Sequence, residues 1–260
     1  MTTRVPDHES GQVLRHEGAQ IYFATGGDER RPPLLLLHGG FGSLEDFQAV
    51  FPGLARDHRL IAIDSRGHGR STLGPEPLSY ARLERDVLAV LARLGLDRVS
   101  IVGFSDGGMV GYRLAAHGAI QVDRLVAIGA PHELPEGDPL REKLASITPA
   151  SWQEKFPESH ALYERLNPEP DFDRFIAAVV AMALDGDGYP NDVVDAIRCP
   201  LLLVRGDDDP LVSLASQARL RARVEGARFL NIPFASHVAF ADQPEIFLQS
   251  VRTFLRQPSP

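Results

Sequence analysis

Val99–Gly108 reads VSIVGFSDGG, and this stretch decides how the chain is expected to fold. The apolar run at its start predicts a buried strand, the glycines predict a tight turn, and Gly108–His117 has the pattern of a helix. A sharp turn from strand to helix crowds the backbone, and glycines on both sides of the central residue remove Cβ atoms that would clash. Ser105 is the only serine with glycine at both −2 and +2. The turn would therefore present its hydroxyl at a helix N-terminus, where N–H groups and the helix dipole favour negative charge.

Short apolar runs alternate with longer segments of helical period on both sides of this stretch. Strands are predicted at residues 13–16, 21–24, 34–37, 60–63, 99–102, 125–128, 201–204 and 228–232. Helices are predicted over residues 44–55, where Ser43 is a candidate cap, and over 80–94, 108–117, 191–198, 213–224 and 244–255. Strands that alternate with helices in this way predict an α/β fold, with a mostly parallel eight-stranded sheet covered by helices on both faces.

The alternation breaks between residues 131 and 190. This stretch is rich in proline and acidic residues and contains the only tryptophan, Trp152. An apolar stripe of helical period over Phe172–Leu184 favours an inserted helical cap over a flexible linker. We therefore expect a core formed by two segments and one cap insertion, at residues 12–131, 191–257 and 132–190 respectively.

The composition of the 260 residues is that of an ordinary globular protein, with 43% hydrophobic and 24% charged residues. A net charge of −8 argues against a general nucleic-acid-binding role. The N-terminus lacks the apolar stretch of a signal peptide, and no window resembles a membrane span. The single cysteine, Cys199, is expected to be a buried structural thiol, which fits a reducing compartment. We expect a soluble cytoplasmic protein that binds neither nucleic acid nor membrane; a homo-oligomer remains open.

A serine hydroxyl needs a base within hydrogen-bond reach to act as a nucleophile. Among the nine histidines, His237 is the one that follows the last predicted strand. Ligands of open parallel sheets bind beyond the carboxyl ends of the strands, so we predict that His237 is the base. His38 and His68 also lie in glycine-rich loops after strands, and we expect local hydrogen bonding from both.

The base needs an acid to orient it, and three carboxylates follow the strand at residues 201–204. The residues alone leave Asp207, Asp208 and Asp209 as candidates. All three lie between Ser105 and His237 in the chain, so each gives the order Ser, Asp, His.

The glycine-rich stretch His38–Ser43, HGGFGS, follows the strand at residues 34–37. A tetrahedral intermediate needs N–H donors aimed at its oxyanion. We predict that the N–H of Asp106 is one donor and that Gly40 supplies the second, with Phe41 as the alternative. Neither a phosphate-binding motif nor zinc-ligand spacing is present, so no cofactor or metal is expected.

Five ordered motifs together resemble the α/β-hydrolase family, in its branch of small capped serine esterases. They lie at residues 38–42, 64–71, 103–108, 205–209 and 236–237. The resemblance implies that the acid is Asp209, the third residue after the loop glycine. Ser213 stands where proline is common in the family, and Ser236 replaces a frequent glycine before the histidine. The loop at residues 64–71 is typical of the family, and we interpret it as structural support.

Asp106 departs from many relatives, which have an apolar residue there. Family members with the motif Gly-x-Ser-Asp-Gly-Gly include amino-acid-ester hydrolases. We hypothesise that the Asp106 carboxylate attracts a substrate ammonium; the alternative is an acidic residue favoured by the helix dipole. Phe41 and Phe104 are further candidate substrate-binding residues.

The expected function is hydrolysis of an ester-like bond of a small molecule through an acyl-enzyme on Ser105. Lactones, thioesters, amides and C–C bonds beside a carbonyl are alternative substrates for the same three residues. Two other hypotheses are perhydrolysis, in which peroxide replaces water, and a ligand receptor. In the receptor, the triad of Ser105, Asp209 and His237 would be present but catalytically idle. Fold analogy alone does not settle the substrate.

Overall fold

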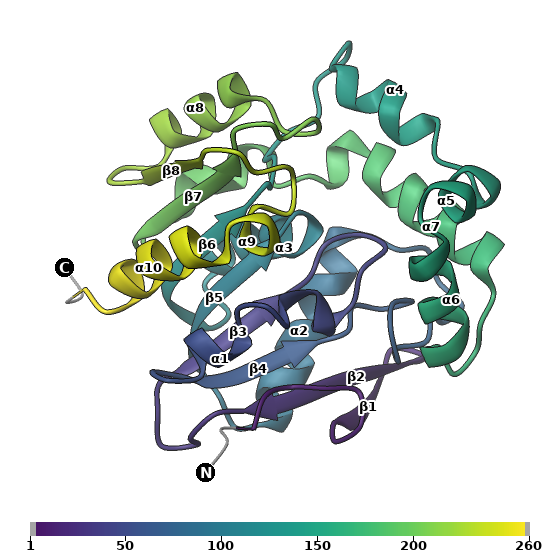
Figure 1. Cartoon of the computed structure of the whole chain (residues 1–260), viewed down its shortest axis with the longest axis horizontal. Helices are drawn as coiled ribbons and strands as arrows, with labels where there is room; N and C mark the ends of the chain where they lie inside the picture. Colours follow the sequence, from purple (N-terminus) through teal and green to yellow (C-terminus); the bar gives the residue numbers. More distant parts are fainter. Residues whose placement is uncertain (1–3, 258–260) are drawn as a thin grey trace.

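The computed structural model describes residues 4–257, and its centre is one eight-stranded sheet (Figure 1). The strands are β1 (Gln12–His16), β2 (Ala19–Gly26), β3 (Pro33–Leu37), β4 (Arg59–Ile63), β5 (Arg98–Phe104), β6 (Gln121–Ile128), β7 (Leu201–Gly206) and β8 (Arg228–Ile232). Their order in the sheet is β1-β2-β4-β3-β5-β6-β7-β8, and only the pairs β1–β2 and β2–β4 are antiparallel. The predicted mostly parallel, eight-stranded α/β fold is confirmed.

Helices cover both faces of the sheet. The helices are α1 (Phe51–Leu54), α2 (Tyr80–Arg93), α3 (Asp106–His117), α4 (Pro139–Ala145), α5 (Pro149–Lys155), α6 (Pro157–Leu166), α7 (Phe172–Leu184), α8 (Leu214–Arg223), α9 (Ala239–Asp242) and α10 (Pro244–Leu255), with 3₁₀ turns η1 (Leu44–Phe47), η2 (Gly186–Gly188) and η3 (Asn191–Ala196). Side chains of α2, α3 and α8 belong to the hydrophobic cluster on one face, and those of α1, α9 and α10 to the cluster on the other. The sheet is thus the middle layer of three.

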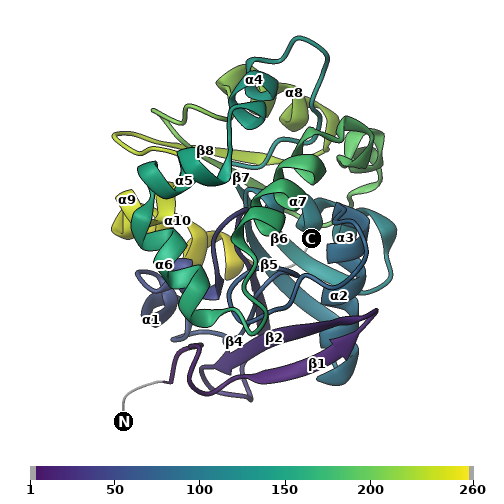
Figure 2. The same ribbon diagram turned by 90° about the vertical axis from the view of Figure 1, so that its right-hand side faces the viewer.

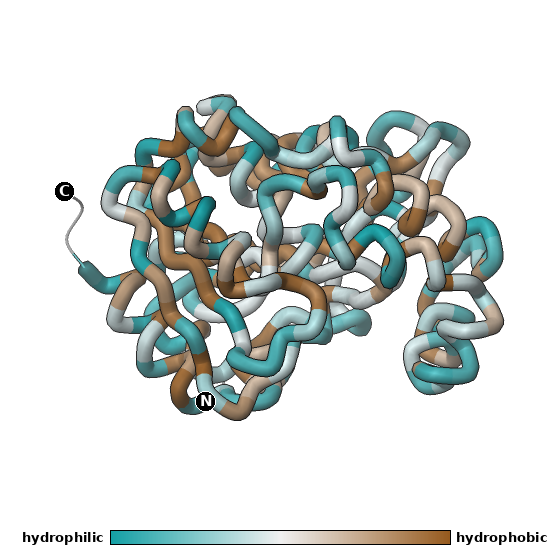
Figure 3. The backbone as a smooth tube through the Cα atoms, turned by 90° about the horizontal axis from the view of Figure 1, so that it is seen from above, coloured by the Kyte–Doolittle hydropathy of each residue, from teal (hydrophilic) through white to brown (hydrophobic). Residues whose placement is uncertain are grey.

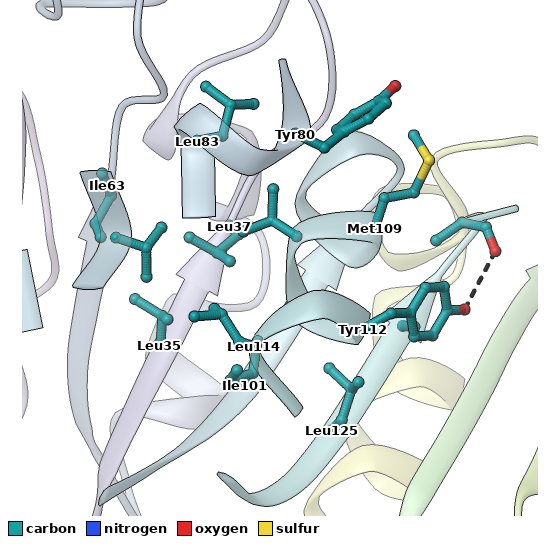
Figure 4. Close-up of a cluster of buried hydrophobic side chains, with 14 of the residues drawn as sticks. Leu35, Leu37, Ile63, Tyr80, Leu83, Ile101, Met109, Tyr112, Leu114 and Leu125 are labelled. Atoms are coloured by element: carbon teal, nitrogen blue, oxygen red, sulfur yellow. Dashed lines mark hydrogen bonds between the residues drawn. The ribbon is translucent and has the colours of Figure 1, made fainter. Parts of the chain in front are cut away.

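Strand β3 shows why the predicted central strands are continuously apolar. Leu35 and Leu37 pack on the α2–α3 side, together with Leu83 and Leu114 (Figure 4). Their neighbours in the strand belong to the cluster on the opposite face. Successive strand residues point to opposite faces, so a strand covered on both faces must be apolar throughout. Figure 3 shows hydrophobic stretches running through the strands and hydrophilic residues along many outer loops.

The single helix predicted over residues 44–55 is wrong, because this segment forms two short pieces, η1 and α1. Pro52 lies in the first turn of α1. Proline lacks the N–H that a continuous helix would need at this position, and it is well suited to a helix start. Ser43 caps η1 instead, with its side chain accepting a hydrogen bond from the Glu45 N–H. The helix predicted over residues 191–198 is the shorter 3₁₀ turn η3.

Four helices, α4 to α7, come between β6 and β7 in the chain. They stand to one side of the three-layered body in Figure 1, and this side faces the viewer in Figure 2. Asn167, between α6 and α7, fastens them to the loop after β4: its Nδ2 donates to the carbonyl oxygens of Gly67, Gly69 and Ser71 at 3.0–3.3 Å. The insertion therefore packs on loops at the carboxyl edge of the sheet. None of the helices within residues 4–257 is long and apolar enough to cross a membrane.

Candidate active site

Ser105 lies at the turn between β5 and α3 with a strained backbone, φ 49° and ψ −115°. A non-glycine residue at positive φ costs on the order of 1–3 kcal/mol and persists only where its surroundings hold it. The Ser105 N–H donates to the carbonyl oxygen of Ile128 at 2.8 Å, which ties the turn to the end of β6. A Cβ atom on Gly103 would overlap the Gly107 carbonyl, and one on Gly107 would overlap the Leu37 carbonyl. Both glycines are therefore required by the turn.

His237 and Asp209 form a hydrogen-bonded pair at the ends of neighbouring strands, with His237 Nδ1 2.9 Å from Asp209 Oδ2. The other carboxylate oxygen accepts the N–H groups of Leu211 and Val212 at 2.8 and 3.0 Å. Burial acts to raise the pKa of Asp209, but the hydrogen bond and charge of His237 and these two N–H groups outweigh it and lower the pKa. Asp209 is thus held as a carboxylate facing His237.

The other two carboxylates of this loop do not reach His237. Asp207 and Asp208 are both exposed, whereas the Asp209 side chain is fully buried. Asp207 instead accepts a hydrogen bond from Asn231 Nδ2 at 2.6 Å. The structure therefore brings only Asp209 of the three sequence candidates to the histidine.

Ser105 and His237 both lie next to the end of β6. The residue after Ile128 is Gly129, and a Cβ atom there would lie 2.9 Å from His237 Cε1. The Phe104 ring packs against His237 with centroids 4.9 Å apart. No hydrogen bond joins Ser105 Oγ to His237 in the part of the chain that is described. Free enzymes often have long catalytic hydrogen bonds that tighten when substrate binds.

The N–H groups of Gly40 and Asp106 are among those near Ser105 that have no hydrogen-bond partner within residues 4–257. The neighbouring Phe41 N–H is already engaged, since it donates to His68 Nε2 at 3.1 Å. This contact favours Gly40 over Phe41 as the second donor. An unpaired N–H at the start of α3 and another in the adjoining loop are what an oxyanion requires.

The histidines of the two glycine-rich loops make local hydrogen bonds, as expected. His38 accepts the Ser65 N–H at Nε2, 2.9 Å away, and its Nδ1 lies 2.7 Å from the Gly39 carbonyl. His68 has the same arrangement, with Nδ1 3.0 Å from the Arg66 carbonyl. Burial lowers the pKa of His68 to about 3, so this ring is neutral. Both rings brace backbone near the site.

Asp106 is nearly buried, and its carboxylate contacts two parts of the site. Its Oδ1 accepts a hydrogen bond from the Tyr80 hydroxyl at 3.0 Å. Its Oδ2 lies 2.8 Å from the position of a Cβ atom on Gly40. Burial raises the pKa of Asp106, and the hydrogen bond from Tyr80 offsets this only in part. Tyr80 was not predicted for the site, because it looks like an ordinary core residue of an amphipathic helix.

The two aromatic candidates for substrate binding are both packed against protein. The Phe104 side chain is buried between His237 and Phe240, with ring centroids 4.9 and 5.1 Å away. The Phe41 ring is half-buried and lies against Trp152 of α5, with centroids 4.1 Å apart. Phe104 therefore supports the His237 ring, and Phe41 joins the core to the insertion.

Comparison with known proteins places this geometry in a family. The family described as "alpha/beta hydrolase fold" matches residues 32–163. The chain belongs to the α/β-hydrolase family. The esterase YbfF of Escherichia coli (strain K12) is 28% identical over 240 residues, covering 86% of this chain and 92% of the relative. A non-heme haloperoxidase of Rhodococcus erythropolis is 30% identical over 253 residues, covering 86% of this chain and 92% of the relative. The crystal structure of a hydrolase from Pseudomonas aeruginosa PA01 matches with a TM-score of 0.78 and 27% identity, covering 96% of this chain and 100% of that one.

The Asp209 loop of this α/β-hydrolase is held by Arg205, a residue that sequence reasoning placed in a motif but gave no role. The guanidinium is buried and donates to the carbonyl oxygens of Asp207, Asp209 and Val212 at 3.1, 3.3 and 2.7 Å. A fourth hydrogen bond, of 3.1 Å, reaches Asn231 Oδ1. Arg205 therefore fixes the backbone that aims two N–H groups at the Asp209 carboxylate.

A cavity of about 290 Å³ lies between this loop and α4. Its lining combines apolar side chains with charged ones, among them Leu140, Lys143 and Leu214.

Among residues 4–257, no group of three or more histidine, cysteine or acidic side chains is placed to hold a metal ion. The chemistry that Ser105, His237 and Asp209 can do is nucleophilic and acid–base.

Proposed function

We propose that this chain is a serine hydrolase that cleaves an ester-like bond of a small molecule. Ser105 is the nucleophile, His237 the base and Asp209 the acid that orients it. The observation that carries the proposal is the strained Ser105 turn together with the hydrogen bond between half-buried His237 and buried Asp209. Similarity to a relative named as an esterase supports the choice of an ester substrate.

The first half of the proposed reaction forms an acyl-enzyme. His237 keeps its Nδ1 proton in the hydrogen bond to Asp209, which leaves Nε2 free to accept the proton of Ser105. The Ser105 oxygen then attacks the carbonyl carbon, and the carbonyl electron pair moves to oxygen. The N–H groups of Gly40 and Asp106 hold this oxyanion. When the intermediate collapses, the protonated His237 donates its proton to the departing alcohol.

The second half repeats these steps with water. His237 takes a proton from water, the resulting hydroxide attacks the acyl carbon, and the Gly40 and Asp106 N–H groups again hold the oxyanion. Collapse releases the carboxylic acid, and the proton on His237 returns to Ser105. Asp209 stays ionised throughout, in agreement with its lowered pKa.

We also propose that the insertion at residues 132–190 is a cap over this site. Val179 of α7 supports the assignment, because it comes within 3.5 Å of a Cβ atom placed on Gly40. A cap of this kind excludes water and selects the substrate. The core would then consist of residues 12–131 and 191–257.

The first test is release of p-nitrophenol from short-chain p-nitrophenyl esters by the wild type and by Ser105→Ala. We expect hydrolysis by the wild type and a loss of at least about 1000-fold in the variant. Activity retained by correctly folded Ser105→Ala would contradict the assignment of the nucleophile. An inactive, correctly folded wild type would favour a lactone or a C–C bond as the substrate, or a ligand receptor whose triad is catalytically idle.

Perhydrolysis is a second candidate function, supported by similarity to a relative named as a non-heme haloperoxidase. In this reaction peroxide, rather than water, attacks the acyl-enzyme. Peroxide-dependent halogenation that needs a carboxylic acid and is lost in Ser105→Ala would support it. Halogenation equal in the two proteins would contradict it.

Asp106 extends the proposal to substrates that carry an ammonium group. Its Oδ2 lies beside Gly40, while Oδ1 is engaged by Tyr80. A cation bound at Oδ2 would favour the charged form of a carboxyl group that burial otherwise disfavours. Asp106→Ala should then raise KM for aminoacyl esters and leave KM for neutral esters of the same size nearly unchanged. Equal changes for both ester classes would contradict the amine preference.

A further inference from the structure

Helix α5 packs beside α6 and α7 and carries the one tryptophan of the chain, Trp152. None of its residues is buried. Trp152, half-buried near its middle, packs its indole on the Phe41 ring at 4.1 Å between centroids. Phe156, which follows the helix, packs on the same indole at 4.6 Å. Trp152 therefore brings α5 into contact with the loop after β3.

The same indole also reaches the backbone of that loop. Trp152 Nε1 donates to Ser159 Oγ at 3.3 Å, and the Ser159 hydroxyl donates to the Phe41 carbonyl oxygen at 3.5 Å. The N–H of Phe41 is held from the opposite side by His68 Nε2. Phe41 is thus held at its ring, its carbonyl and its N–H, and Trp152 contributes to the first two.

Phe41 needs such support because its backbone is strained. The Gly42 N–H donates to the Gly39 carbonyl at 3.3 Å, which closes a four-residue turn. Phe41 occupies the third position of this turn with φ 63°. Turns with positive φ at the third position strongly favour glycine there. The side chain that replaces glycine must therefore be held in place by its contacts.

Gly40, the proposed oxyanion donor, is the second residue of the same turn and is bonded directly to Phe41. A change in the Phe41 backbone would therefore change the turn and shift the Gly39–Gly40 peptide unit, which carries the Gly40 N–H. We propose that Trp152 is a positioning residue of the active site, which acts through Phe41 to aim the Gly40 N–H at the oxyanion. The inference rests on the proposed function. It makes α5 part of the catalytic apparatus, although none of its side chains needs to touch the reacting atoms.

If Trp152 only contacted the acyl chain of the substrate, its replacement would have a different kinetic effect. Loss of a substrate contact raises KM, whereas loss of a group that acts in the transition state lowers kcat and kcat/KM together. A small acyl group, such as the acetyl group of p-nitrophenyl acetate, makes this separation sharp because it offers little surface for a direct contact. A mechanism through Phe41 also predicts that the effects of changing Trp152 and Phe41 do not add.

The experiment compares five proteins on p-nitrophenyl acetate: wild type, Trp152→Ala, Trp152→Phe, Phe41→Ala and the double Ala variant. We expect Trp152→Ala to lower kcat about 10- to 100-fold, less than the full loss of one oxyanion donor, with little change in KM. Trp152→Phe keeps a ring on Phe41 but removes the N–H that donates to Ser159, so its kcat should lie between those of the wild type and Trp152→Ala. The double variant should be no slower than the slower single variant.

Three results would overturn the inference: an unchanged kcat in Trp152→Ala, an effect confined to KM, or losses that multiply in the double variant. Ser105→Ala measured alongside separates this failure from failure of the proposed function, which would show as activity retained in that variant. If Trp152→Ala does not fold, Ser159→Ala replaces it, because it removes only the hydrogen-bonded link. A partial loss of kcat is then expected, and an unchanged kcat would overturn the inference.

Trp152 fluorescence provides a second readout in the unmodified protein, since this is the only tryptophan. Reaction of Ser105 with a fluorophosphonate places a tetrahedral group in the oxyanion site. If the Phe41 turn couples that site to the indole, the emission of Trp152 changes on phosphonylation. Emission identical before and after complete labelling would contradict the coupling.

Discussion

Gly129 lies directly beside the ring of His237. A Cβ atom on Gly129 would come within 2.9 Å of both Cε1 and Nδ1 of His237, and within 3.3 Å of Asp209 Oδ2. Its φ of 54° is also one that non-glycine residues rarely adopt. A single residue after β6 thus provides the space in which the His237 ring and the Asp209 carboxylate meet.

Gly129→Ala should therefore damage both activity and stability. Displacing the His237 ring by a fraction of an ångström to one ångström is expected to lower kcat on the order of 100-fold. Kinetics on a p-nitrophenyl ester, together with urea unfolding, measure the two effects. Gly118→Ala is the matched control, because Gly118 also has positive φ, 68°, but open space around it. It should lose about 1–2 kcal/mol of unfolding free energy and no kcat. Equal kcat in the two variants would contradict the role given to Gly129.

Asp209→Asn should remove the orienting charge without a change of size. The amide is expected to leave His237 in the wrong tautomer and to lower kcat by up to about 10,000-fold. Asp208→Asn is the control from the same loop, because its side chain is exposed, and it should keep nearly full activity. Steady-state kinetics on one ester decide the matter. A larger loss in Asp208→Asn than in Asp209→Asn would move the acid to Asp208.

Arg205→Lys should loosen the loop that presents Asp209. A lysine cannot reproduce the planar set of four hydrogen bonds to three carbonyls and one side-chain amide. We expect a loss of about 2–3 kcal/mol in unfolding free energy, since buried charged hydrogen bonds are lost, and a lower kcat at unchanged KM. Urea unfolding and ester kinetics measure both.

Arg219→Lys is the control for this substitution. Arg219 makes an ion pair with Glu133 and is half exposed, and such surface pairs contribute about 0–1 kcal/mol. Arg219→Lys should change neither the unfolding free energy nor kcat appreciably. Arg205→Lys with stability and kcat like those of Arg219→Lys would show that the loop does not depend on the guanidinium.

His8 should give the protein stability that disappears at high pH. The buried ring lies 2.9 Å from Asp64 Oδ2 and 3.1 Å from Glu45 Oε1. Burial acts to lower the pKa of His8, but the hydrogen bond and charge of Asp64 and the charge of Glu45 outweigh it and raise the pKa. With the folded pKa above the unfolded value of about 6.5, the contribution is complete below that value and is lost as pH rises through the folded pKa. The difference in unfolding free energy between wild type and His8→Gln should shrink as pH rises.

His58 offers a control of opposite sign. Burial lowers its pKa, so the unfolded chain binds the proton more tightly than the folded one. The free-energy difference between wild type and His58→Gln should therefore grow as pH rises through the same range. Denaturant unfolding at about pH 5.5, 7 and 9 measures both trends. Parallel trends for the two variants would contradict the assignment of the His8 ion pairs.

Much of the core could be predicted because its signals are local. The apolar runs, the glycines around Ser105 and the position of His237 after the last strand all depend on near neighbours in the sequence. In a parallel sheet, residues that follow different strands meet at one edge. This rule predicts that Ser105, His237 and one carboxylate of residues 207–209 lie close together, and the family resemblance selects Asp209 among the three.

The insertion was predicted less well for a physical reason. Only α7 has a clear apolar stripe, because α4, α5 and α6 bury one residue at most. Their remaining signals are prolines at the first helical position, Pro139, Pro149 and Pro157, which mark helix starts. These prolines would have placed the three helices.

Long-range contacts of the site have no comparable signal. Tyr80 reaches Asp106 only because α2 packs beside α3, and Trp152 reaches Phe41 only because the insertion folds back over the loop after β3. Each residue looks ordinary in its own segment. Arg205 is similar, since three of its four partners are backbone carbonyls, which leave no trace in the side-chain pattern.

Covalent labelling tests the central proposal most directly. The folded protein is treated with a fluorophosphonate, digested, and the modified peptide identified by mass spectrometry, with Ser105→Ala and His237→Ala treated in parallel. The proposal predicts stoichiometric labelling at Ser105, loss of esterase activity in proportion, no label in Ser105→Ala and much slower labelling in His237→Ala. Labelling at another serine, or full ester hydrolysis by a protein already phosphonylated at Ser105, would contradict it.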